Sequence, residues 1–321
     1  MRNQDAIGGW VLALVLVGPI VGAAAPPSGD GAAAIKVDAE PLLREFDALP
    51  KNTTAAQYDR YIADHRAILT ATARPYGPAL MWALEYERSE AVMALLRAGV
   101  TVPHGAVTLA ARGGLDEIIP ILVARGATAS DRDAALLSAA KYGHSSTLRL
   151  LLTLGAKIEF AAPNDGFTPL HVAVMERRID AVRVLLAANA PLEAPDHNGK
   201  TPLSWGPFAY MPQEKHIYQK LGRPHDTVYV DPGEAEAITL LLDAGANLET
   251  TDREGNTPLH QAVMLGSLRG AETLLARGAK VNAKNRSGQT PLSLAKARQN
   301  TEMVKLLSRK PTRPIKSKPT P

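Results

Sequence analysis

The chain has no cysteine, so neither a disulfide framework nor lipid attachment at a cysteine can form. Aromatic residues make up only 5% of its 321 residues, whereas alanine is abundant. That composition favours thin, closely packed helices over a thick β-sandwich or barrel. The motifs HExxH and GxSxG are also missing, which leaves hydrolytic chemistry without a recognisable carrier. We therefore expect no enzyme activity and no cofactor.

The basic character of the chain points to its last residues. The formal net charge is +4 and the pI is about 9.2. Residues 309–321 hold five basic residues and no acid, which leaves a net charge of −1 for the rest of the chain. A folded part so close to neutrality predicts no nucleic-acid partner. Residues 310–321, rich in proline and lysine, are predicted to form a disordered basic tail.

The first residues have the pattern of an export signal. Arg2 precedes an apolar stretch centred on residues 10–17, and Pro19 and several small residues follow it. This pattern predicts a secretory signal peptide over residues 1–24, a disordered linker over 25–37 and a protein located in the periplasm or outside the cell. The apolar run is shorter than the ~20 residues that span a bilayer, so no stable membrane insertion is expected after cleavage. The alternative is an uncleaved anchor and a membrane-tethered scaffold.

A four-residue box recurs in the second half of the chain. It begins at Thr168, Thr201, Thr257 and Thr290, in steps of 33, 56 and 33 residues, and each copy reads Thr-Pro-Leu followed by His or Ser. Threonine can cap a helix with its hydroxyl, and proline suits the first helical position because its missing N–H would be unpaired there. Each box therefore predicts the start of a helix.

A second mark keeps the same phase as the box. A pair of leucines, or its substitute, is followed by glycine and alanine, which predicts the end of a second helix. Glycine readily adopts the left-handed conformation that closes a helix, and asparagine is the next-best residue for it. The predicted closing residues are Gly99, Gly126, Gly155, Asn189, Gly245 and Gly278.

These segments resemble ankyrin repeats, with the finger turn, TPLH box, helix-turn-helix and Gly-Ala exit of that family. The finger motif, an Asp or Asn three residues before a glycine, occurs at Asp196, Asp252 and Asn285, whereas Pro163 replaces it one repeat earlier. The resemblance implies an all-α solenoid of about seven stacked helix-turn-helix units over residues 75–309, with short β-hairpin fingers in its C-terminal half. Residues 38–74 have helical spacing and are predicted to cap the open end.

The resemblance also implies that the chain binds another protein, as a monomer and without catalysing a reaction. Exported ankyrin proteins act as scaffolds, inhibitors or protective partners, so a role as inhibitor, immunity protein or scaffold is the sharper hypothesis. Partners of the family lie across the finger tips and the first helices. The matching positions here are Phe167, His197, Asn198, Arg253, Glu254, Arg286, Tyr142 and Arg177. The box histidines, His171 and His260, are expected to make structural hydrogen bonds.

The 56-residue step contains an insertion, residues 207–232, which the leucine phase places between the two helices of one unit. With the adjacent Trp205, it holds five of the fifteen aromatic residues in the chain. Insertions in solenoids often lie on the binding face, and aromatic residues are enriched in interfaces. The predicted contacts are Phe208, Tyr210, Tyr218 and Tyr229. Two alternatives stay open: the insertion covers neighbouring helices, or it forms a metal or enzyme site with His216, His225 and Asp226 or Asp231.

Overall fold

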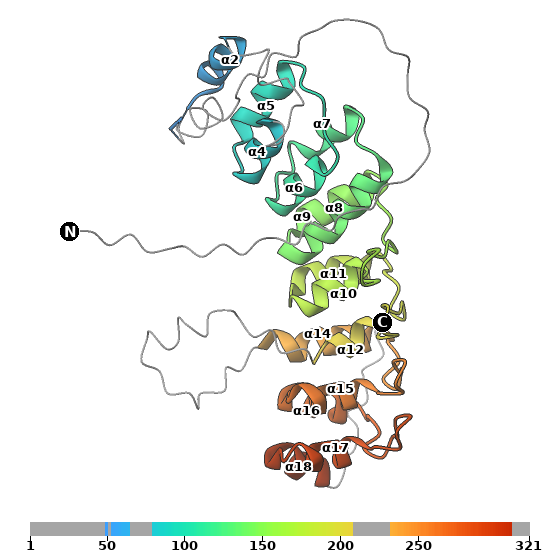
Figure 1. Ribbon diagram of the computed structural model, residues 1–321. Helices are drawn as coiled ribbons and strands as arrows, with labels where there is room; N and C mark the ends of the chain where they lie inside the picture. Colours follow the sequence, from blue (N-terminus) through green and yellow to red (C-terminus); the bar gives the residue numbers. More distant parts are fainter. Residues whose placement is uncertain (1–48, 51–52, 65–78, 208–231, 310–321) are drawn as a thin grey trace, which may run out of the picture. The chain divides into compact units, whose positions relative to one another are not determined.

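A computed structural model describes residues 49–50, 53–64, 79–207 and 232–309, all within one compact unit, Ala39–Pro321 (Figure 1). The predicted signal peptide, linker and basic tail lie outside the described residues. The same holds for most of the predicted N-terminal cap and for residues 208–231 of the insertion. None of the helices in the described ranges combines the length and the apolar character that a membrane crossing requires.

The described residues contain seven helix pairs that follow one another along the chain, which confirms the predicted number of units (Figure 1). The first helices of the pairs are α4 (Ala79–Glu85), α6 (Ala106–Arg112), α8 (Ala129–Tyr142), α10 (Pro169–Met175), α12 (Pro202–Trp205), α15 (Pro258–Leu265) and α17 (Pro291–Ala297). The second helices are α5 (Ser89–Arg97), α7 (Ile119–Ala124), α9 (Ser145–Thr153), α11 (Ile179–Ala187), α14 (Pro232–Asp243), α16 (Leu268–Ala276) and α18 (Thr301–Ser308).

Helices of the same kind pack against each other from unit to unit. Each first helix contacts the next, from α4 to α17, and the second helices from α9 onward do the same. A further helix, α2 (Ala55–Asp64), packs against α5 and buries Tyr58 and Ile62, as expected of a capping element. Nearest-neighbour packing therefore replaces a single central core, which is the arrangement of a solenoid.

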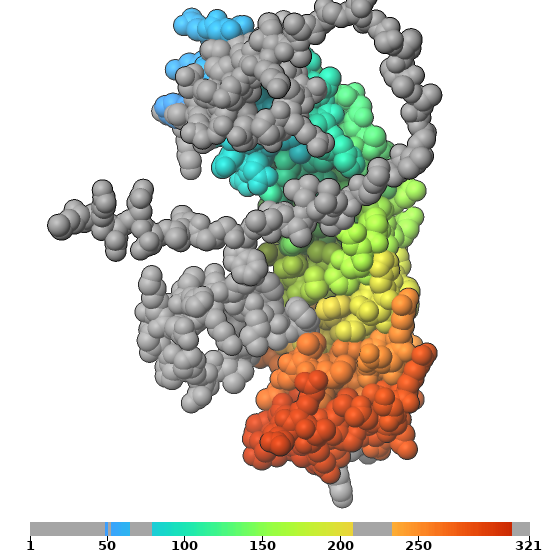
Figure 2. Space-filling model, viewed as in Figure 1, coloured from blue at the N-terminus to red at the C-terminus, as the bar shows by residue number. Residues whose placement is uncertain are grey.

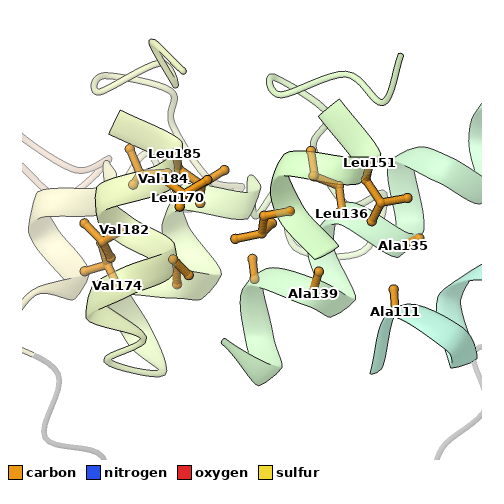
Figure 3. Packing of buried hydrophobic residues seen from close by; sticks show 14 of the residues in the cluster. Ala111, Ala135, Leu136, Ala139, Leu151, Leu170, Val174, Val182, Val184 and Leu185 are labelled. Carbon is orange, nitrogen blue, oxygen red and sulfur yellow. The ribbon is translucent and has the colours of Figure 1, made fainter. Parts of the chain in front are cut away.

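Alanine makes this close stacking possible. Ala111, Ala135 and Ala139 are fully buried where α6 and α8 approach each other, and the larger Leu136 and Leu151 fill the space beside them (Figure 3). Small side chains allow helix backbones to approach, and leucines supply most of the apolar area that stabilises the packing. The scarcity of aromatic residues in the sequence follows from this thin, two-helix layer.

Three of the four box threonines start their helices as predicted. Thr168, Thr257 and Thr290 each accept a hydrogen bond from the backbone N–H three residues later, with proline at the first helical turn. The predicted closing residues are also confirmed. The five glycines have φ values between 83° and 102°, and Asn189 has a φ of 58°. Local chemistry thus fixes the start of three units and the end of six.

The start of α8 was not predicted. A capping box forms between Thr128 and Asp131, and the helix begins at Ala129, where the recurring four-residue box does not occur. Asp131 also accepts a hydrogen bond from the backbone of Gly105 (3.0 Å) and lies 2.6 Å from His104. Burial raises the pKa of Asp131, but the hydrogen bonds from Gly105 and Thr128 outweigh it and the net pKa is lowered. The ionised carboxylate therefore links two neighbouring units.

The predicted β-hairpin fingers are not supported, because no residue in the described ranges forms a strand. The loops between units are tight turns instead. In the finger from Asp196 to Lys200 a single backbone hydrogen bond, 2.8 Å long, joins the two ends, and Asp252 and Asn256 are joined in the same way at 3.1 Å. Turns of this length leave too few paired residues to make a ladder.

Candidate protein-binding surface

Each finger turn is organised by one carboxylate or amide oxygen. Oδ1 of Asp196 accepts hydrogen bonds from the backbone N–H groups of Asn198 (2.7 Å) and Lys200 (2.8 Å). Oδ1 of Asp252 does the same for the residues two and four positions later, at 2.9 and 2.8 Å, and Asn285 repeats the pattern at 3.1 and 2.9 Å. A short polar side chain that bonds its own backbone two residues ahead favours a turn. The sequence motif therefore has a physical cause.

The second carboxylate oxygen ties the finger to the first helix of its own unit. Oδ2 of Asp196 accepts from the indole N–H of Trp205 (3.0 Å), and Oδ2 of Asp252 accepts from the amide of Gln261 (2.7 Å). Trp205 and Gln261 occupy the same position, one residue after the four-residue box. In the two repeats whose finger motif begins with Pro163 or Asn285 in place of aspartate, this position holds Val172 or Leu294. A side-chain donor thus occurs at this position only where the finger motif begins with aspartate. This pairing in the sequence would have revealed the contact between finger and helix.

Successive fingers are joined to each other through their backbones. The N–H of His197 donates to the carbonyl of Asp165 (2.8 Å), that of Arg253 to Asn198 (3.0 Å), and that of Arg286 to Glu254 (2.9 Å). Five predicted contact residues therefore lie side by side, and their side chains are all exposed. We name this set the finger row: His197, Asn198, Arg253, Glu254 and Arg286. Bonded backbones hold the exposed side chains of the row in fixed register.

Phe167 lies beside the finger row but is half-buried. Its ring is 5.2 Å from the ring of Trp205, in edge contact, and 5.8 Å from the ring of His171. The ammonium of Lys200 lies 4.7 Å above Trp205. This aromatic group, which the sequence did not reveal as a cluster, fixes Trp205 at the point where the insertion begins. Aromatic and cation–π contacts of this kind stabilise by about 0.5 to 1.5 kcal/mol each.

The other predicted contact residues are placed differently. Tyr142, at the end of α8, is 43% exposed. The expectation that Arg177 lies on the open surface is wrong. Its side chain is only 9% exposed and its guanidinium lies 3.8 Å from the buried carboxylate of Glu234. The four insertion residues, Phe208, Tyr210, Tyr218 and Tyr229, lie outside the described part of the chain.

The described ends of the insertion are fixed to both neighbouring units. Glu234, in the first turn of α14, faces Arg177 from the preceding unit and accepts a hydrogen bond from the hydroxyl of Ser267 in the following unit. A Cβ added to Gly270 of α16 would lie 2.6 Å from Glu234 and 3.1 Å from Pro207. The close approach requires glycine at position 270 and positions the chain on either side of the insertion.

The box histidines make the structural hydrogen bonds expected of them. Nδ1 of His171 bonds the hydroxyl of Thr168 (2.8 Å), and its Nε2 lies 3.1 Å from the carbonyl of Lys200 in the next finger. His260 repeats both contacts, with Gln289 as the carbonyl partner. A carbonyl can only accept, so Nε2 carries the proton. Burial lowers the pKa of both histidines, more than the carbonyl hydrogen bonds raise it, and both rings are neutral near pH 7.

The unit with the insertion lacks this bridge. Ser204 takes the place of the box histidine, and the predicted side-chain cap at Thr201 does not form. Both hydroxyls are buried, and neither has a hydrogen-bond partner among the described residues. The first helix of this unit is also only four residues long. The contacts around Glu234 and the bond from Trp205 to Asp196 therefore carry much of the attachment of this unit to its neighbours.

No group of three His, Asp or Glu side chains in the described ranges could hold a metal ion. The candidate residues His216, His225, Asp226 and Asp231 lie outside those ranges.

Two finger glycines allow a direct test of the row. A Cβ at Gly255, which has a φ of +78°, would lie 2.9 Å from the backbone nitrogen of Arg286, whereas a Cβ at Gly288, with a φ of +73°, meets nothing. Gly288→Ala should therefore cost only the left-handed strain, about 1 kcal/mol of unfolding free energy. Gly255→Ala should cost about 2 kcal/mol or more, because the next finger must also move. Urea denaturation measures both, and equal losses would show that the fingers do not pack as described.

Comparison with known proteins assigns the fold to a family. The family model described as ankyrin repeats (3 copies) matches residues 107–198, and a second, ankyrin repeats (many copies), matches residues 241–295. The chain contains ankyrin repeats over both of these stretches. Ankyrin repeats form protein–protein interaction modules, and the fold is in general non-enzymatic.

Similar proteins share one stretch with this chain and are much longer than that stretch. Tyrosine-protein kinase HTK16 of Hydra vulgaris is 35% identical over 109 residues, which is 32% of this chain and 14% of the kinase. ARF GTPase-activating protein GIT1 of Homo sapiens is 38% identical over 80 residues, 25% of this chain and 10% of that protein. Inversin of Mus musculus is 26% identical over 251 residues, 73% of this chain and 21% of inversin. The chain therefore spans only 10% to 21% of the length of these relatives.

Proposed function

We propose that this ankyrin-repeat chain acts in the periplasm or outside the cell as a non-catalytic binding partner of another protein, and that the finger row is its recognition surface. The sharper form of this proposal is a role as inhibitor, immunity protein or scaffold for the bound protein. The single observation that carries the proposal is the row itself: five exposed polar side chains from neighbouring units, fixed in register by backbone hydrogen bonds between fingers.

The chemistry of the row suits a polar protein surface. It offers two arginines, one glutamate, one asparagine and one histidine, so charges of both signs and neutral donors and acceptors alternate along it. Surfaces of this kind select partners by electrostatic complementarity more than by apolar area. The turns that present these side chains are rigid, because Asp196 and Asp252 bond two of the fingers to their own helices and backbone hydrogen bonds join successive fingers. Little conformational entropy is therefore lost when a partner binds.

The insertion supplies a second contact in this proposal. Interface energy is usually concentrated in a few aromatic or arginine anchors. The four aromatic residues between Pro207 and Pro232 provide such anchors in a chain that has few others. The described ends of the insertion lie in the unit whose finger is organised by Asp196, and Asp252 organises the next finger. Both of these fingers carry residues of the finger row. The sequence pattern of residues 1–24 supports the proposed location, because it has the charge, apolar stretch and small residues of an export signal.

Affinity capture from the native extracytoplasmic fraction tests the proposal, with variants of the bait to locate the surface. The finger variant replaces His197, Asn198 and Arg253 with alanine, and the insertion variant replaces residues 208–231 with a short Gly-Asn linker. A control variant replaces three exposed polar residues of the second helices, Arg149, Asp180 and Glu272. We expect one protein to bind the parent and the control alike, and to bind each of the other two variants at least about tenfold more weakly.

Location is read from the same preparation. N-terminal sequencing of the native chain should begin at or near Ala24 or Ala25. Retention of Met1 on cytosolic material would refute export. A captured protein that binds the finger variant as tightly as the parent would refute the finger row as the recognition surface.

A further inference from the structure

Charge is distributed very unevenly along this chain. Residues 1–267 contain 23 basic and 30 acidic residues, a net charge of −7, whereas residues 268–321 contain 13 basic and two acidic residues, a net charge of +11. Residues 309–321 account for only five of these 13 basic residues. Residues 268–308 already carry eight basic residues against two acids. The surplus therefore begins inside the last two folded units.

The structure leaves most of these cations without an acid partner. Arg277 pairs with Asp243 of α14 (2.7 Å) and Lys305 pairs with Glu302 (2.8 Å). Six others are exposed, and none has an acid within ion-pair distance in the described part of the chain. We name these six the basic end: Arg269, Lys280, Lys284, Arg286, Lys296 and Arg298. Arg298 donates a hydrogen bond to the carbonyl of Met264 (2.9 Å), which does not neutralise its charge.

The cations belong to elements that are adjacent in the stack. Three lie in the loop before α17, two lie on α17 or just after it, and one lies on α16, which contacts α18. The last two units form a continuous surface, coloured orange to red in Figure 2. Like charges on adjacent elements cost free energy through mutual repulsion unless a partner neutralises them.

One cation lies on the open face of the last unit. Lys296 occupies the position that holds Val174 and Val263 in earlier units, and both valines are 1% exposed because the next unit covers them. Lys296 is exposed, since no described unit follows α17 and α18. Ser293 likewise replaces the buried box histidine at this end. The end face of the stack is therefore polar and carries positive charge of its own.

The composition of this end decides between classes of partner. Residues 268–321 contain no Phe, Tyr or Trp. Single-stranded nucleic acid is usually held by bases stacked on aromatic rings, and tight protein interfaces usually need aromatic anchors. An anionic lipid surface needs neither, because it attracts clustered lysines and arginines through its surface potential alone.

We propose that the basic end docks onto the surface of an anionic lipid bilayer, through charge and without insertion. This goes beyond the proposed binding of a protein by the finger row, because it assigns a different ligand to the basic end, which shares only Arg286 with that row. The bilayer holds the end of the stack, and the finger row of the earlier units stays available to a protein.

Co-sedimentation with lipid vesicles tests the proposal on the full chain. The vesicles contain about 30% phosphatidylglycerol in phosphatidylcholine, or phosphatidylcholine alone. The test variant carries Lys280→Glu, Lys284→Glu and Lys296→Glu. Its matched control carries Lys141→Glu, Arg149→Glu and Lys157→Glu, three exposed cations of an earlier unit, and changes the net charge equally.

The parent should bind the anionic vesicles, release them at about 0.5 M salt, and leave the neutral vesicles unbound. Each lysine near an anionic surface contributes about 1 kcal/mol, so the test variant should partition at least about 100-fold more weakly, while the control changes several-fold at most. Equal losses in test and control would show that net charge acts without a defined surface and would overturn the proposal. Binding to neutral vesicles, or tighter binding to duplex DNA than to anionic vesicles, would overturn it as well.

Discussion

Replacing Leu259 with alanine is expected to lower the free energy of unfolding by about 2 to 5 kcal/mol. Leu259 is 1% exposed in the first turn of α15, which packs between α12 and α17. Truncation removes apolar contacts with two neighbouring units at once and leaves a cavity that rigid helix backbones cannot fill. Urea denaturation followed by far-ultraviolet circular dichroism measures the loss.

The last unit offers a matched control for this substitution. Leu292 is the equivalent leucine of α17, but it is only partly buried because no described unit covers its far side. Leu292→Ala should therefore cost markedly less, about 1 to 2 kcal/mol. Equal losses from Leu259→Ala and Leu292→Ala would show that position in the stack does not matter, which contradicts nearest-neighbour packing. A loss below 0.5 kcal/mol at Leu259, about the size of a surface substitution, would mean that the repeat register is wrong.

The units could be predicted from the sequence because their ends depend on local chemistry. A threonine before proline caps a helix, and a glycine with positive φ closes one, whatever the rest of the chain does. Asn189 illustrates the point, since it replaces glycine and keeps a φ of 58°. The α8 helix shows the limit of this approach. Its cap is formed by Thr128 and Asp131, which lie outside the recurring box, so the box could not show where this helix begins.

The surface was less predictable than the fold, because exposure depends on neighbours that are distant in sequence. The resemblance to ankyrin repeats predicted Arg177 as a partner contact. The following unit contributes Glu234, however, and both side chains are buried. The opposite holds for Lys296, which becomes exposed only because its unit has no described successor. The finger row was easier to predict, since its residues lie at the tips of turns that each aspartate organises from within.

The buried ion pair between Arg177 and Glu234 lies in the middle of the stack. Among the charged groups there, its loss is expected to lower the free energy of unfolding most. Their side chains are only 9% and 10% exposed. Breaking a buried pair by removing one partner typically costs about 3 to 5 kcal/mol, because the remaining charge stays desolvated. Glu234→Gln preserves the shape of the side chain and an oxygen that can accept from Ser267. We expect this variant to lose about 3 kcal/mol of unfolding free energy.

The helix that carries Glu234 provides its own control two residues later. Glu236 pairs with Arg183 at 2.5 Å, but their side chains are 44% and 53% exposed. Exposed pairs contribute about 0 to 1 kcal/mol, so Glu236→Gln, which removes the same charge from the same helix, should have little effect. A double variant, Arg177→Met with Glu234→Gln, should recover most of the lost stability because no charge is then left buried without its partner. If both single glutamine variants cost less than 1 kcal/mol, the unit that carries the insertion is held by apolar packing and the bond between Trp205 and Asp196, and the contacts of Glu234 are incidental.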